Sequence, residues 1–187
     1  MKKIKYLTLL AMAFYLAGCA SMGEGTREEK QQQILKMKIK VLKKLYKHKP
    51  DVESQIQSAP GYAVFSNAGM SFFIVSAGTG YGVVEEVKTG KKFYMNMAEG
   101  GLALGLGVKD YRIVMIFHKK KAMEDFINYG WKFGGNADAA AKSSDKGGAL
   151  GEEVYSGDVT VYSFTKNGIA LQAAVKGTKF WVDTNLN

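Results

Sequence analysis

The sequence predicts a single α+β domain built on a strongly curved antiparallel sheet or a small β-barrel of about eight strands. The first observation is size, because 187 residues with 47% hydrophobic content suffice for one ordinary domain. The second is pattern: a segment with helical periodicity precedes many short apolar runs separated by turn residues. The third is glycine inside the predicted strands, which is typical of coiled or bulged strands (Gly78, Gly80, Gly82, Gly101, Gly105 and Gly107).

The N-terminal 18 residues have the pattern of an export signal. Residues 1–5 carry three lysines, and residues 6–16 form an apolar run that is too short for a stable membrane-spanning helix. The run ends in Leu16-Ala17-Gly18-Cys19, which resembles the signal of bacterial lipoproteins. This resemblance implies removal of residues 1–18 and attachment of lipid, including an acyl chain such as palmitate, to Cys19. With Ala20 rather than Asp after Cys19, it also implies an outer-membrane lipoprotein that faces the periplasm. An ordinary cleaved signal and an N-terminal membrane helix remain as alternatives.

Composition narrows the function classes. One Cys and two His exclude a disulfide framework or a Cys-rich zinc site and leave little for a catalytic triad or a metal centre. Removing Lys2, Lys3 and Lys5 lowers the net charge from +9 to +6, which is too weak for a dedicated nucleic-acid binder. We therefore expect a binding or structural protein without enzyme activity, cofactor, metal or nucleic acid.

Residues 19–30 are interpreted as a lipidated, flexible tether, and residues 31–187 as the single domain. Residues 31–49 predict a basic amphipathic helix, whose apolar and lysine residues occupy opposite faces. Pro50 ends this helix, and Asp51 is expected to cap a short second helix that runs to about Gln57.

The strands are predicted from apolar runs and turn signals. A hairpin turn is expected at residues 88–90, with Gly90 at positive φ, and another tight turn at Lys109-Asp110. Residues 121–129 predict one inserted helix that Gly130 terminates. Residues 134–157 suggest a long loop with one strand at most. A three-strand meander is predicted at the C-terminal end, over residues 159–164, 169–175 and 178–182. The preceding strands are predicted over residues 62–66, 71–77, 81–87, 91–97, 102–108 and 112–118.

Residues 52–183 resemble the SYLF domain family of lipid-binding and actin-associated domains. The segments that carry this resemblance are 56–65, 78–84, 100–117, 133–139 and 161–169, in the family's order and spacing. Residues 93–98 lack the Trp-Ser/Thr-x-Pro motif of many members, which puts any ligand contact of that motif in doubt. Phe93 and Tyr94 are expected to pack in its place. The family's lipid binding implies a basic amphipathic helix ahead of the sheet, a position that residues 31–49 occupy.

Two lysine clusters are the candidate sites for lipid headgroups. One is the helix stripe Lys36, Lys40, Lys43, Lys44 and Lys47, and the other is Lys119, Lys120 and Lys121. The alternative for both is a solvated surface without a ligand. The Gly-rich segments are interpreted as strands because they lack the spacing and βαβ context of a nucleotide site. Trp131, Tyr162 and Trp181 are expected to be core or edge aromatics, with a lipid-tail groove as the alternative.

The sequence thus predicts a lipid-anchored envelope protein whose SYLF-like domain binds anionic phospholipid or acyl lipid. The alternative is a structural lipoprotein that binds an envelope protein partner and has no lipid preference of its own.

Overall fold

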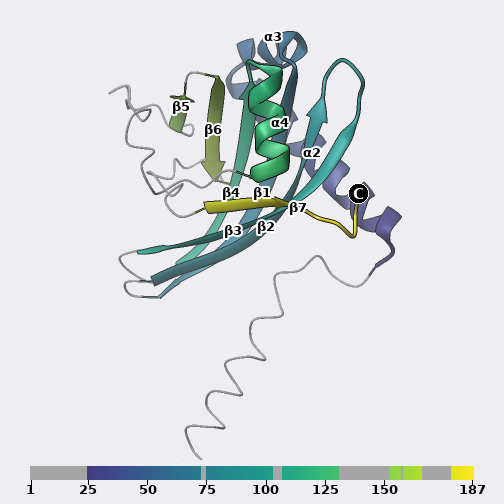
Figure 1. Cartoon of the computed structure of the whole chain (residues 1–187). Helices are drawn as coiled ribbons and strands as arrows, with labels where there is room; N and C mark the ends of the chain where they lie inside the picture. The colour runs from purple at the N-terminus through teal and green to yellow at the C-terminus, as the bar shows by residue number, and fades with distance from the viewer. Residues whose placement is uncertain (1–24, 73–74, 103–106, 131–151, 157, 166–177) are drawn as a thin grey trace, which may run out of the picture.

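The computed structural model describes residues 25–72, 75–102, 107–130, 152–156, 158–165 and 178–187. Within these residues the chain forms an α+β domain, in which one antiparallel sheet carries helices on both faces (Figure 1). The helices are α2 (Arg27–His48), α3 (Asp51–Ser58) and α4 (Lys120–Tyr129). The strands are β1 (Gly61–Phe72), β2 (Val75–Glu86), β3 (Lys92–Leu102), β4 (Gly107–Phe117), β5 (Glu152–Ser156), β6 (Val159–Thr165) and β7 (Thr178–Val182). The expected helix pair and inserted helix are therefore confirmed.

The sheet is open. Its strand order is β5-β6-β4-β1-β2-β3-β7, and within the described ranges its two end strands do not pair with each other. The small-barrel alternative is therefore wrong for this part of the chain. The described residues contribute seven strands, and the further strand expected at 169–175 lies outside them.

Two predictions about strand ends are wrong. Residues 62–66 and 71–77 are not two separate strands, because β1 runs unbroken from Gly61 to Phe72 and β2 begins at Val75, within the second range. β1 pairs with both β2 and β4. Lys109 and Asp110 do not form a turn, since they lie inside β4 opposite Gly69 and Ala68. The small residues of β1 and the polar residues of β4 remain in extended strands because these two strands pair with each other, although they lie far apart in the sequence.

The predicted C-terminal meander is also wrong. Both edges of β6 are occupied, one by β4 and the other by β5. β7 pairs instead with β3, near the opposite end of the sheet. Turn residues indicate where a strand ends, but they do not determine which strand becomes its neighbour.

Each face of the sheet is buried by a different helix layer, because successive strand residues point to opposite sides. Ala63 and Phe65 of β1 face α4 and contribute to a core with Phe126 and Phe180. Tyr62 and Val64 face the other way and contribute to a second core with α2 and α3, whose members include Val41, Leu42, Leu45, Val52 and Ile56. This second core fixes the orientation of α2.

Local signals place the turns and helix ends. Gly90 has φ 69° in the β2–β3 hairpin, as predicted. Gly130 ends α4 with φ 67°, and its N–H donates to the Phe126 carbonyl at 2.9 Å. A Cβ at Gly130 would lie 2.0 Å from the Phe180 carbonyl oxygen, so only glycine fits this approach between α4 and β7. Asp51 is the first residue of α3 rather than its cap, and its carboxylate accepts from the Gln55 amide at 2.9 Å.

Candidate functional site

Helix α2 begins at a closed capping box. The Thr26 hydroxyl accepts from the Glu29 N–H at 3.2 Å, and the Glu29 carboxylate accepts from the Thr26 N–H at 2.8 Å. One turn later, the Gln31 side chain donates to the Leu186 carbonyl at 2.7 Å. The start of α2 is thus held both by its own cap and by the C-terminal segment.

The apolar side of α2 is buried against the sheet. Ile34, Val41, Leu42 and Leu45 are all buried. Ile34 packs with Val83, Tyr94 and Leu186, beyond the core that the rest of the helix shares with α3. Tyr94 is buried there and Phe93 packs against the core on the α4 side, so the expected aromatic packing is confirmed.

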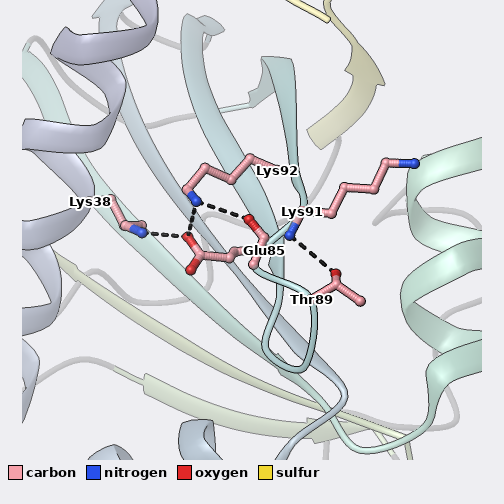
Figure 2. Close-up of polar contacts among 6 residues, drawn as sticks. Lys38, Glu85, Thr89, Lys91 and Lys92 are labelled. Carbon is pink, nitrogen blue, oxygen red and sulfur yellow. Dashed lines mark hydrogen bonds and ion pairs between the residues drawn. The ribbon is translucent and has the colours of Figure 1, made fainter.

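One lysine of α2 is also directed inward. Lys38 Nζ lies 2.5 Å from Glu85 Oε2 of β2, with the two side chains only 12% and 18% exposed. Lys92 of β3 approaches the same carboxylate at 3.7 Å, so two cations share Glu85 (Figure 2). Lys38 also lies 5.8 Å from the centroid of the Tyr62 ring. Burial, followed by the charge of Glu85 and a hydrogen bond to it, raises the pKa of Tyr62.

The five lysines of the predicted helix stripe separate into two groups. Lys44 lies over a ring of β6, with its Nζ 5.8 Å from the centroid of Phe164. Lys49, the residue that follows α2, lies in the same way 4.9 Å from the ring centroid of Tyr162. Lys36, Lys40, Lys43 and Lys47 are exposed and make no ion pair with any described residue. We call these four residues the α2 lysine face. The structure therefore brings together four of the five predicted stripe residues and turns Lys44 towards the sheet.

Ile39 lies on the same outward side and was missed by the sequence analysis. Its side chain is 61% exposed, which makes it one of three large exposed hydrophobic residues in the described part of the chain. A helical projection would have found it, because about 100° per residue places it about 40° from Lys43 and about 60° from Lys36.

The second predicted cluster, at the start of α4, has a different electrostatic environment. Lys119 lies 2.7 Å from Asp158, and Lys121 lies 2.8 Å from Asp125. Lys120 lies 3.5 Å from Glu124. The hydrogen bond from Lys121 to Asp125, with the Asp125 charge, raises the pKa of Lys121. Each lysine of this α4 lysine cluster thus has a carboxylate neighbour.

The other candidate residues are structural or lie elsewhere. Trp181 is 40% exposed on β7, whereas Tyr162 is buried and lines a shallow apolar hollow between α2 and β6. Glu85 and Glu86 face opposite sides, as strand neighbours should, since Glu86 is 4.0 Å from Lys120 of α4. Cys19 and Trp131 lie outside the described residues. No helix in the described part is long and apolar enough to cross a membrane.

A buried polar cluster on the α4 side of the sheet is a packing feature. Glu99 accepts from the Asn67 amide at 2.8 Å and from the Tyr111 hydroxyl at 2.5 Å. Burial, followed by the hydrogen bond to Glu99 and the charge of that carboxylate, raises the pKa of Tyr111. All three side chains are nearly inaccessible to solvent, so they join strands β1, β3 and β4 rather than offer a surface to a ligand.

Two sequence comparisons with known proteins identify the family. A family profile described as "Ysc84: Las17-binding protein actin regulator" matches residues 98–187. "Beta cell expansion factor A" of Aeromonas veronii is 32% identical over 167 residues, which is 86% of this chain. The chain spans 60% of the length of that relative. The profile covers three of the five segments that carried the predicted resemblance, at residues 100–117, 133–139 and 161–169. With the relative, it shows that the chain belongs to the SYLF (Ysc84) domain family.

Proposed function

We propose that this protein is a non-catalytic lipoprotein of the bacterial envelope whose SYLF domain binds anionic phospholipid through the α2 lysine face. Membership of the family supports a lipid- or actin-related binding role. The observation that carries the narrower proposal is the set of four exposed lysines, on a docked helix, without a carboxylate partner among the described residues.

Charge explains the preference for anionic lipid. A lysine near an anionic bilayer contributes about 1 kcal/mol of attraction, and four lysines on one helix face act together. Side chains already paired with carboxylates offer less, because their charge is locally compensated. We therefore assign headgroup binding mainly to the α2 lysine face and only a minor part of this binding to the α4 lysine cluster.

The N-terminal segment supports a mechanism with two attachments. Gly25, the first described residue, comes six residues after Cys19 in the sequence. Fully extended, six residues span about 20 Å. A lipid on Cys19 would therefore hold α2 close to the bilayer. This raises the effective concentration of headgroups around weakly binding lysines.

The test is co-sedimentation of residues 20–187, which retain every described residue, with vesicles. Phosphatidylglycerol-containing and pure phosphatidylcholine vesicles are compared at 50 and 300 mM salt, where the screening length falls from about 14 to about 6 Å. We expect binding that requires the anionic lipid and weakens at the higher salt concentration.

The decisive variant replaces Lys36, Lys40, Lys43 and Lys47 with Gln, and it should weaken binding by at least about tenfold. A matched control removes the same charge from exposed lysines elsewhere, at Lys88, Lys91, Lys121 and Lys179. If both variants lose binding equally, net charge rather than the α2 lysine face is responsible. If the wild-type domain binds no vesicle, the proposal is wrong and protein partners become the candidates.

A further inference from the structure

The way α2 packs restricts how it can meet a bilayer. A surface-binding amphipathic helix normally buries its apolar side in the headgroup region. In this structure that side is already buried in the protein, with Ile34 0%, Val41 5% and Leu45 5% exposed. Inserting it into lipid would require α2 to leave the sheet and expose the core beneath.

Polar contacts also fix α2 on the sheet. Lys38 and Lys92 share the Glu85 carboxylate, which joins the middle of the helix to strands β2 and β3 (Figure 2). The Gln31 contact with the Leu186 carbonyl joins the second turn of the helix to the C-terminal segment. Undocking would therefore break the Lys38–Glu85 ion pair and the Gln31–Leu186 hydrogen bond, in addition to exposing the core.

The outward side of α2 contains the group that a docked helix can insert. Ile39 is 61% exposed, although aliphatic side chains of this size are mostly buried. It lies between Lys36 and Lys40 in sequence and one helical turn before Lys43. An apolar side chain beside cations that have no carboxylate partner among the described residues is complementary to a bilayer surface, where anionic headgroups lie above apolar chains.

We propose that α2 binds an anionic bilayer while it stays docked on the sheet, with Ile39 entering the boundary between headgroups and acyl chains. The α2 lysine face then contacts the surrounding phosphates. This inference rests on the proposed function and adds to it the inserted residue and the state of the helix.

Insertion is tested by a probe at residue 39. Residues 20–187 contain no cysteine, because Cys19 is the only one in the chain, so Ile39→Cys supplies a single labelling site for an environment-sensitive fluorophore. With vesicles of 30% phosphatidylglycerol in phosphatidylcholine, we expect a blue shift and increased emission. The same label at Tyr129→Cys, which replaces an 82% exposed residue on α4, should respond little.

Partitioning of unlabelled variants gives the second measurement. Removing the apolar side chain in Ile39→Ser should weaken vesicle binding about tenfold, whereas Ile39→Leu should bind like the wild type. Tyr129→Ser is the matched control for loss of an exposed hydrophobic residue, and it should leave binding unchanged. Soluble glycerol phosphate, which has the headgroup chemistry but no bilayer, should not compete.

Hydrogen exchange distinguishes the docked from the undocked helix. If α2 stays on the sheet, its amides and those of β2 keep their protection on vesicles; if it leaves, both lose it. Loss of this protection, an unshifted label at residue 39, wild-type binding by Ile39→Ser or full competition by glycerol phosphate would each overturn the inference. In all four cases the lysine-dependent binding of the proposed function would still stand. If the wild-type domain does not bind these vesicles at all, both this inference and the proposed function are wrong.

Discussion

Two lysine-rich surfaces of this protein look alike in the sequence and differ in the structure. The α4 lysine cluster has a carboxylate within 4 Å of each lysine, at Asp158, Glu124 and Asp125. The α2 lysine face has none among the described residues. The number of lysines on a surface therefore does not identify a site for an anionic ligand. The positive charge that remains after lysines pair with neighbouring carboxylates is a better indicator of such a site.

The largest effect is expected when the α2 lysine face is given partners like those of α4. Lys36→Glu together with Lys47→Glu places an acid four residues before Lys40 and four residues after Lys43. The face loses two cations and the other two become paired. Binding to anionic vesicles should fall by about a hundredfold. Titration with vesicles, followed by light scattering, measures the loss of binding. An equal loss of binding in a Lys88→Glu, Lys91→Glu variant would contradict the assignment to the α2 lysine face.

A second prediction separates the inward lysine of α2 from an outward one. Lys38→Met removes the closest cation from the partly buried Glu85, so it should lower the free energy of unfolding by about 1–2 kcal/mol. Lys40→Met, at an exposed position, should change it by less than about 0.5 kcal/mol. Urea unfolding followed by circular dichroism compares the two variants. Equal stability would mean that the Lys38–Glu85 pair does not hold the helix.

Alkaline pH should act on the packed side of α2. Burial, then the charges of Tyr62 and Glu53, raises the pKa of Tyr46 to about 12 from its ordinary value of 10.0. The unfolded chain therefore ionises first, so the contribution of Tyr46 is complete below about pH 10 and is lost as the pH rises towards 12. With allowance for solvent screening, the free energy of unfolding should fall by roughly 0.5–1 kcal/mol between pH 9 and 11. Urea unfolding at several pH values should show a weaker dependence in Tyr46→Phe.

The smallest effect is the reverse of the first. Glu124→Gln with Asp125→Asn removes the nearest carboxylates of Lys120 and Lys121 on α4 while keeping the side-chain size, and it leaves Glu86 at 4.0 Å from Lys120. The weaker compensation of these two cations should strengthen binding to anionic vesicles about threefold, and the gain should disappear at 300 mM salt. Unchanged binding at 50 mM salt would show that the orientation of α4, not pairing, keeps this cluster from the bilayer.

The sequence predicted what depends on neighbouring residues. The periodicity of residues 31–49 located most of α2 and its four outward lysines, although the helix begins at Arg27, within the range predicted as a flexible tether. Gly90 and Gly130 marked a turn and a helix end that the structure confirms. The partners of Lys120 and Lys121 were also readable, because Glu124 and Asp125 follow them by four residues.

What the sequence did not predict depends on contacts between distant residues. The pairing of β1 with β4 and of β7 with β3 joins segments that no local signal connects. The pair between Lys119 and Asp158 crosses from α4 to the start of β6, and the pair between Lys38 and Glu85 crosses from α2 to β2. Ile39 differs from these cases, because its outward position follows from helix periodicity and requires no distant contact.

The closed start of α2 has a mechanical consequence. The Thr26–Glu29 cap closes the first turn of the helix, and the Gln31–Leu186 contact joins the second turn to the C-terminal segment. That segment is fastened in turn to β3, where the Asn187 side chain contacts the Tyr94 backbone at 3.0 and 2.8 Å. Tension applied through the residues before Thr26 therefore passes into the sheet instead of unwinding the helix from its end. These contacts would help the outward face of α2 to keep its shape when the chain is pulled from its N-terminal side.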